Sequence, residues 1–207
     1  MLKTPFKESP LVRFKLSEAV ASRPKFAGVT IGEKSFLCHL NLRGDPGDTQ
    51  FLDAAKSALG FDLPLKANTG ASAGKRTVCW LGPNEWLIIL PEDEAASVTE
   101  NLHKALAGLF FALTDVSGGQ TVVVVSGDNV LDVLAKGCSL DLHAREFGIG
   151  QCAQSHLGKA PIFLHKINEA PTFELVVRRS FSDYFWLWFE AASKEYGLQV
   201  VNLTTRI

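Results

Sequence analysis

Residues 120–137 read Gln-Thr-Val-Val-Val-Val-Ser-Gly-Asp-Asn-Val-Leu-Asp-Val-Leu-Ala-Lys-Gly. Valine fits a pleated strand well, so the run of four valines predicts a strand over residues 120–126. Gly127 and Asp128 form a turn signal, and the apolar residues after them recur at helical spacing. Gly137 ends this short helix, because glycine readily adopts the left-handed conformation found after helices. The stretch predicts a strand, a turn and a helix in succession.

The first half of the chain carries the same succession of elements. Residues 35–42 alternate as a strand and lead into the turn signal of residues 44–47. Asp48 is a good N-cap for a helix that ends before Gly60. The apolar positions of the two predicted helices match at a constant offset, with Phe51, Leu52 and Ala55 corresponding to Val130, Leu131 and Leu134.

Further elements extend the match between the two halves. Two strands over residues 76–81 and 85–90 precede a helix over residues 92–107, and residues 173–177 repeat the second of these strands before another helix. We interpret the pattern as an internally duplicated strand-helix-strand-strand-helix module. The fold class is α+β, with both modules packed as one compact unit because neither half is comfortably large enough to bury a core alone.

We divide the chain into three parts. Residues 1–26 form an N-terminal arm that mixes Pro, Lys, Arg and Ser, with a short helical turn near residues 17–21. Residues 27–110 form the first α+β module, and residues 111–207 form the second. Such arms often wrap around a partner.

The composition is that of a soluble globular protein, with 46% hydrophobic and 21% charged residues. Its 21 basic and 22 acidic residues give a net charge of −1, which argues against nucleic acid and an anionic membrane surface as partners. The N-terminus has no secretory signal pattern, and the apolar runs are too short to span a bilayer. The 4 cysteines lie mostly in apolar segments, as reduced thiols of a cytoplasmic protein do.

Two glycine-rich stretches resemble nucleotide-binding motifs but lack the required context. Residues 70–76 approach a P-loop, yet the glycine spacing is short, Arg76 replaces the magnesium-binding hydroxyl residue and a strand follows. We expect a flexible loop there. Residues 148–153 fit the dinucleotide pattern G-x-G-x-x-A, but no apolar strand precedes them and no helix follows. Neither stretch predicts a cofactor site.

Four cysteine and histidine residues between positions 138 and 156 are a candidate metal site. Thiolates and imidazoles are the ligands that zinc prefers, but the spacing of Cys138, His143, Cys152 and His156 matches no compact zinc motif. Buried cysteines and surface histidines are the favoured interpretation. We predict no metal-binding, cofactor-binding or catalytic residue in this chain.

An aromatic helix near the C-terminus is the strongest anomaly of the sequence. We expect Ser180 and Asp183 to form its capping box and Gly197 to end it. At 100° per residue, Trp186 and Leu187 point away from the main aromatic stripe of this helix, so one sheet cannot cover them all. Two interpretations stay open: a deeply embedded helix, or a helix that also contacts a partner subunit. The predicted interface residues are Tyr184, Trp186, Leu187, Trp188, Trp80 and Trp86.

Several quoted stretches together resemble the gamma subunit family of heterotetrameric sarcosine oxidase. They are residues 80–87 (Trp-Leu-Gly-Pro-Asn-Glu-Trp-Leu), residues 115–121 (Asp-Val-Ser-Gly-Gly-Gln-Thr), residues 134–143 (Leu-Ala-Lys-Gly-Cys-Ser-Leu-Asp-Leu-His), residues 152–154 and the aromatic helix. The resemblance covers residues 36–197 and leaves the arm out. It also implies a fold similar to the N-terminal domain of the glycine-cleavage aminomethyltransferase.

The resemblance implies a structural, non-catalytic subunit with alpha, beta and delta subunits as partners. FAD, FMN, NAD, tetrahydrofolate and zinc are then expected on those other chains. Such a complex converts sarcosine, O2 and tetrahydrofolate into glycine, hydrogen peroxide and 5,10-methylenetetrahydrofolate.

The alternative is a stand-alone folate-binding protein or one-carbon transferase. The aminomethyltransferase has an acidic pair beside its folate, where residues 157–162 of this chain offer Leu-Gly-Lys-Ala-Pro-Ile. Without that carboxylate, charge cannot polarise a bound folate amine, which favours the scaffold over the transferase.

Overall fold

The computed structural model describes residues 7–20 and 26–203 and contains two β-sheets. The five-stranded sheet has the order β3-β4-β5-β2-β6, and the six-stranded sheet has the order β11-β1-β7-β10-β9-β8. The strands of the first sheet are β2 (Cys38–Gly44), β3 (Gly70–Ala73), β4 (Arg76–Gly82), β5 (Glu85–Leu90) and β6 (Phe111–Asp115). Those of the second are β1 (Val29–Lys34), β7 (Gln120–Ser126), β8 (Cys152–Leu157), β9 (Ala160–Asn168), β10 (Thr172–Arg178) and β11 (Leu198–Val200).

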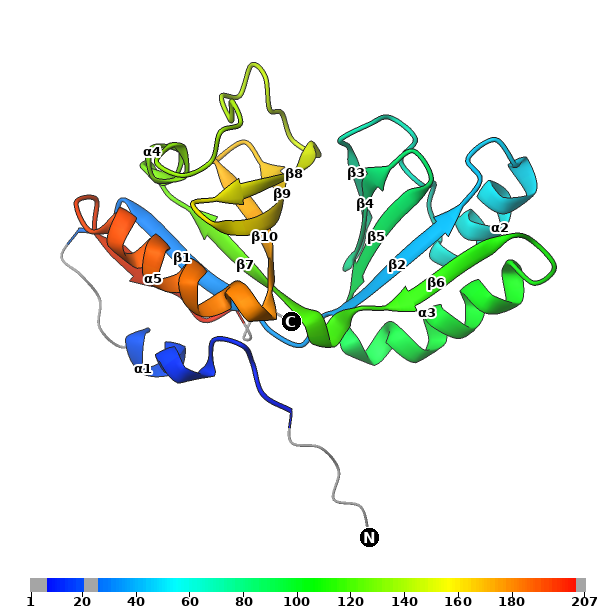
Figure 1. The fold of residues 1–207 in the computed structure, drawn as a ribbon, viewed down its shortest axis with the longest axis horizontal. Coiled ribbons are helices and arrows are strands. Elements are labelled where there is room, and N and C mark those ends of the chain that lie inside the picture. The colour runs from blue at the N-terminus through cyan, green and yellow to red at the C-terminus, as the bar shows by residue number, and fades with distance from the viewer. Residues whose placement is uncertain (1–6, 21–25, 204–207) are drawn as a thin grey trace, which may run out of the picture.

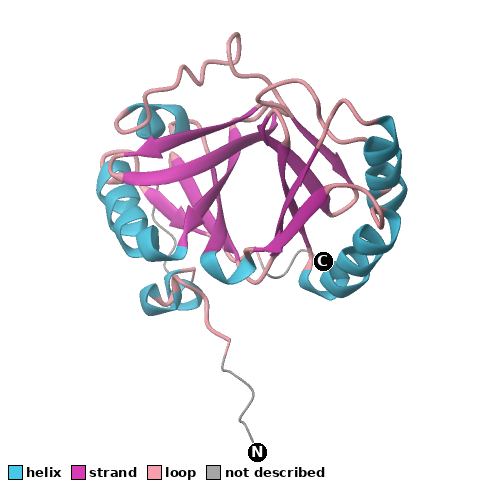
Figure 2. Cartoon of the chain, turned by 45° about the vertical axis from the view of Figure 1, so that its right-hand side comes forward, coloured by secondary structure: helices cyan, strands magenta, loops and turns pink. Residues whose placement is uncertain are grey.

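Helices cover the outer face of each sheet, and the inner faces point toward one another (Figure 1). Helices α2 (Thr49–Leu59) and α3 (Glu92–Ala105) pack on the five-stranded sheet. Helices α4 (Val130–Ala135) and α5 (Ser182–Ser193) pack on the six-stranded sheet. Figure 2 shows the helices on the outside and the strands on the inside. A third apolar cluster joins the inner faces and consists of Cys79, Leu87, Ile89, Val122, Cys152, Phe163 and Val176.

Local sequence rules account for the limits of several elements. The Asp48 carboxylate accepts a hydrogen bond from the Gln50 amide at 2.9 Å, so the predicted N-cap of α2 is confirmed. Gly60 has φ of +91° and ends this helix as expected. The capping box predicted for the aromatic helix is wrong. Helix α5 begins at Ser182 after a 3-10 turn, and the Asp183 carboxylate forms an ion pair with Arg13 instead.

The duplication is visible in the sheet topology, which confirms the predicted α+β class. In the first half, β2, α2, β3, β4, β5 and α3 follow in order, and β7, α4, β8, β9, β10 and α5 repeat them. Neighbouring strands correspond as well, since β3-β4-β5-β2 in one sheet matches β8-β9-β10-β7 in the other.

The predicted division at residue 110 does not follow the sheets. Strand β1 precedes β2 in the chain but lies in the six-stranded sheet, antiparallel to β7. Strand β6 starts at Phe111 and completes the five-stranded sheet beside β2. Each half therefore places one strand beside elements of the other half. The sequence of a short apolar strand does not indicate which sheet the strand joins, because the hydrophobic pattern is local and strand pairing involves distant segments.

The N-terminal arm packs on the second module within residues 7–20. It contains a 3-10 turn (Val12–Phe14) and the short helix α1 (Leu16–Ala19). Helix α1 lies close to the helical turn predicted near residues 17–21, of which residue 21 is outside the described residues. Leu11 is fully buried in the core of the six-stranded sheet. The arm residues 1–6 and 21–25 also lie outside the described residues.

The two glycine-rich stretches have no nucleotide-binding structure. Residues 70–76 form the hairpin of β3 and β4, with Gly74 at φ of +61°, so the expected flexible loop is in fact paired strand. Residues 148–151 lead into strand β8 and open no helix, as the sequence predicted.

Candidate subunit interface and intersheet cleft

Helix α5 buries its main aromatic stripe on the six-stranded sheet. Phe185 and Phe189 are fully buried and lie in the core cluster of that sheet. Trp186 is 4% exposed because Phe14 of the arm stacks on it, with ring centroids 5.4 Å apart. The Arg13 guanidinium holds Asp183 at 2.8 Å on the same side of the helix. The chain's own arm thus covers the second aromatic face, and the prediction of Trp186 as an interface residue is wrong.

Tyr184 and Trp188 are half-buried against the turn between β8 and β9. The Lys159 amide donates a hydrogen bond to Tyr184 Oη at 3.0 Å. A methyl group at Gly137 or Gly158 would collide with this aromatic pair, and both glycines therefore permit the close approach of α5. Leu187 remains 50% exposed. Tyr184, Leu187 and Trp188 stay predicted interface residues.

The two tryptophans on the β4–β5 hairpin differ in their surroundings. Trp86 is fully buried, its Nε1 donates a hydrogen bond to Pro64 O at 2.8 Å, and its ring lies 5.8 Å from that of Phe51. The prediction of Trp86 as an interface residue is therefore wrong, because it belongs to the core of the five-stranded sheet. Trp80 is half-buried and stays a prediction.

A cleft of about 380 Å³ opens between the two sheets. Asn41 Nδ2 donates a hydrogen bond to Glu85 Oε1 at 2.7 Å, and Arg43 lies 2.9 Å from Oε2 of the same carboxylate. Gln154 of β8 donates to the Leu81 carbonyl of β4 at 3.0 Å and so bridges the sheets. Within the described residues, Glu85 is the single carboxylate that lines the cleft, and it is already paired.

Polar side chains also pair between strands within the six-stranded sheet, from β1, β9 and β10. Lys34 Nζ lies 2.5 Å from Glu174 Oε1, and His165 Nδ1 lies 3.7 Å from Glu174 Oε2. Burial alone would raise the pKa of Glu174, but the neighbouring His165 and the Lys34 ammonium together lower it to about 2. Glu174 is therefore a permanently ionised anchor and not a proton donor near neutral pH.

The four residues of the metal-site hypothesis are spread over separate environments. Cys152 lies in the apolar intersheet cluster beside Cys79, which is not one of the four. The hydrogen bond with Cys152 and burial raise the pKa of Cys79. Cys138 Sγ lies 3.5 Å from Ser155 Oγ, whereas His143 and His156 are exposed. In residues 7–20 and 26–203, no three His, Cys, Asp or Glu side chains gather as metal ligands would.

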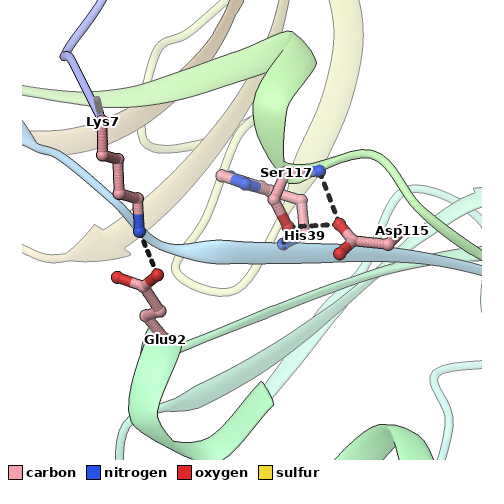
Figure 3. A network of polar contacts seen from close by, with 5 residues as sticks. All are labelled: Lys7, His39, Glu92, Asp115 and Ser117. Carbon is pink, nitrogen blue, oxygen red and sulfur yellow. Dashed lines mark hydrogen bonds and ion pairs between the residues drawn. The ribbon is translucent and has the colours of Figure 1, made fainter. Parts of the chain in front are cut away.

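The Asp115-Val116-Ser117 stretch forms a polar connection at the crossing between the sheets (Figure 3). Ser117 Oγ and N donate to Asp115 Oδ1 at 2.5 Å and 2.8 Å, and the His39 amide donates to Ser117 Oγ at 2.9 Å. Lys7 of the arm pairs with Glu92 at the start of α3 on the same side. These bonds hold β2, β6 and the arm in place.

His39 has no chemical role in this connection despite its position. Its side chain is 1% exposed, and neither ring nitrogen has a hydrogen-bond partner among the described residues. Burial lowers its pKa to about 4, so the ring is neutral at pH 7. His39 bonds to Ser117 only through its backbone amide, and a ring without a hydrogen bond to the serine hydroxyl is not placed to act as its base. The serine, histidine and aspartate are close in space but form no nucleophilic arrangement.

A second exposed surface lies at the start of β6 and was missed by the sequence predictions. Phe110 is 95% exposed and adjoins an apolar groove of about 420 Å³. The uncharged run Leu-Phe-Phe-Ala-Leu-Thr at residues 109–114 is the signal that could have found it.

None of the helices in the described part of the chain has the length and apolar character of a bilayer-spanning segment.

The duplicated two-sheet architecture defines an aminomethyltransferase-like fold. Glycine cleavage system aminomethyltransferase T from Bartonella henselae superposes with a TM-score of 0.62 and 15% identity, over 90% of this chain and 50% of that chain. The predicted likeness of fold is confirmed.

The chain belongs to the sarcosine oxidase, gamma subunit family, whose model matches residues 43–195. The gamma subunits from an Arthrobacter species and from Corynebacterium sp. strain U-96 are 32% and 31% identical over 187 and 197 residues. These alignments cover 90% of both chains in the first case, and 94% of this chain and 93% of the relative in the second. A chain of the heterotetrameric sarcosine oxidase from Corynebacterium sp. U-96 superposes with a TM-score of 0.82 and 29% identity, over 92% of this chain and 96% of that chain.

Proposed function

We propose that this chain is a structural subunit of a heterotetrameric sarcosine oxidase and carries out no chemistry itself. The observation that supports this most is the match to a chain of a solved heterotetramer with a TM-score of 0.82 over 96% of that chain. A likeness of fold over almost the whole length supports the same kind of place in an assembly for this chain. The partners in this proposal are the alpha, beta and delta subunits.

The side chains with potential chemistry support a non-catalytic role. Glu174 is paired, the Cys79 and Cys152 thiols lie in an apolar cluster, and His39 is neutral and unbonded at its ring. A nucleophile needs an adjacent base or a lowered pKa together with access to a substrate, and none of these four residues combines them. In the proposal, FAD, FMN, NAD, tetrahydrofolate and zinc belong to the other subunits. The buried free thiols support a cytoplasmic location.

Co-expression with the partner subunits tests the proposal. We expect native mass spectrometry to show one copy of this chain in each complex, with flavin absorbance in the complex and none in the purified chain. Sarcosine turnover or stoichiometric flavin on the purified chain would overturn the non-catalytic role. Failure to co-purify with the partners would overturn the role as a subunit.

A folate-binding protein or one-carbon transferase is the second candidate. The cleft of about 380 Å³ between the sheets of an aminomethyltransferase-like fold supports it. The chemistry of the cleft fits it poorly, because the Glu85 carboxylate is already bound to Arg43 and Asn41 and so cannot polarise a folate amine. Titration of the purified chain with tetrahydrofolate separates the two candidates. Saturable micromolar binding favours the second, and an absence of binding removes it.

A further inference from the structure

Strand β6 is an edge strand whose outer side has no pairing strand among the described residues. Its sequence lacks the lysine or proline that commonly protects such an edge from other chains. Phe110, immediately before it, is 95% exposed. An edge strand whose one charged residue, Asp115, stands at its end, and which follows an exposed phenylalanine, is a surface that a folded protein normally covers.

The duplication provides an internal comparison, because the same position in the six-stranded sheet is filled. Strand β1 lies beside β7 as β6 lies beside β2, and both pairs are antiparallel. Ile31 pairs with Val125, two residues before Gly127, and Leu113 pairs with Leu42, two residues before Gly44. On the outer side of β1 runs β11, parallel to it, with Val29 opposite Leu198 and Ile31 opposite Val200.

The burial of equivalent residues shows what the additional strand contributes. Val29 and Ile31 are fully buried, and Leu198 and Val200 pack on the same core. Phe111 and Leu113 face the corresponding core of the five-stranded sheet but are only half-buried. The five-stranded sheet therefore presents an incompletely covered core beside β6.

The backbone of β6 is oriented to accept another strand. The Val116 amide donates to the His39 carbonyl of β2 at 2.9 Å. Amide directions alternate along a strand, so the amides of Ala112 and Thr114 also face β2, whereas those of Leu113 and Asp115 face the open side. An apolar groove of about 420 Å³ beside Phe110 lies at the start of this edge.

We propose that a β-strand of a partner subunit adds to β6, parallel to it, in the position that β11 occupies in the other sheet. Its alternate apolar side chains lie beside Phe111 and Leu113, and one further apolar side chain fills the groove beside Phe110. Main-chain hydrogen bonds hold such an added strand, and side-chain pockets select it. This proposal rests on the proposed role of the chain as a subunit.

Amide hydrogen exchange of the intact complex at single-residue resolution tests the added strand. We expect the amides of Leu113 and Asp115 to exchange at least about 100-fold more slowly than in an unstructured peptide, like those of Ala112 and Thr114. If the complex forms while the Leu113 and Asp115 amides exchange freely, the added strand is refuted and the subunit role stands. If no complex forms, both proposals fail. Protection within a homodimer of this chain would identify a second copy as the occupant and refute a partner subunit.

A pair of surface variants tests the groove in the same complex. Phe110→Ser should weaken assembly by at least about 10-fold, because it removes the aromatic wall of the groove against which the partner's apolar side chain packs. Ile149→Ser is the matched control, since Ile149 is also an exposed apolar side chain but lies in the loop before β8. Equal assembly of the Phe110→Ser variant and the control would refute the groove as a binding site.

Discussion

The ring of Trp186 stacks on the ring of Phe14 at a centroid distance of 5.4 Å, which joins helix α5 to the N-terminal arm. This contact covers a helix face that would otherwise expose a large aromatic side chain. The surface that α5 leaves for a partner is correspondingly reduced to Leu187 and the half-buried Tyr184 and Trp188. The arm is therefore part of the core of the second module.

Replacing Trp186 should destabilise the chain far more than replacing its neighbour. Trp186→Ala removes a buried ring and should cost about 3–5 kcal/mol of unfolding free energy. Leu187→Ala, at a half-exposed position of the same helix, should cost less than about 1 kcal/mol. Urea unfolding followed by far-UV circular dichroism measures both. Similar losses for the two variants would contradict the burial of Trp186 by the arm.

Glu174 should make the stability of the chain depend on acid pH. Its folded pKa of about 2 lies below the ordinary 4.5, so its contribution is present above pH 4.5 and is lost as pH falls toward 2. The size of this contribution is on the order of 3 kcal/mol. In Glu174→Gln the pH dependence between 4.5 and 2 should shrink by that amount, as measured by urea midpoints. An unchanged dependence would show that Lys34 and His165 do not hold the charge.

His39 should cause a second loss of stability on acidification, in a pH range above that of Glu174. Its pKa is about 4 when folded and 6.5 when unfolded, so the unfolded state binds a proton first as pH falls. Stability should therefore decrease between pH 6.5 and pH 4, by on the order of 3 kcal/mol. His39→Leu should remove this decrease and should match or exceed the wild type at pH 7, because no buried ring nitrogen is left unpaired. A steep loss of stability between pH 6.5 and 4 in the His39→Leu chain would assign the titration to another group.

Gly158 should tolerate alanine much less well than Gly74. Both glycines have positive φ, at +59° and +61°, so the backbone strain introduced by alanine is about 1 kcal/mol in each case. An alanine methyl group at Gly158 would also collide with Tyr184 Oη and Trp188, whereas nothing lies within 4 Å at Gly74. We expect Gly158→Ala to cost about 1–3 kcal/mol more than Gly74→Ala in urea unfolding. Equal costs would mean that α5 shifts freely away from the turn between β8 and β9.

Several elements could be predicted because their signals are local. Asp48 and Gly60 mark the limits of α2, and the matched apolar positions of α2 and α4 reveal the duplication. The limits of α5 were predicted less well, because Asp183 bonds to Arg13 across the fold and not to its own helix end. The burial of Trp86 could not be predicted from neighbouring residues, because the groups that contact its ring, Phe51 and the Pro64 carbonyl, are distant in the sequence.

The amino-acid sequence by itself determined the α+β class, the repetition of the module and the family to which the chain belongs. These properties depend on periodicity and on short motifs, which operate over a few residues. The tertiary structure alone decided that β1 and β6 lie beside strands of the opposite half, that Phe14 covers Trp186, and that the described part of the chain leaves the outer side of β6 unpaired. Such outcomes depend on which distant segments compete for the same apolar surface, and no local pattern records the result of that competition.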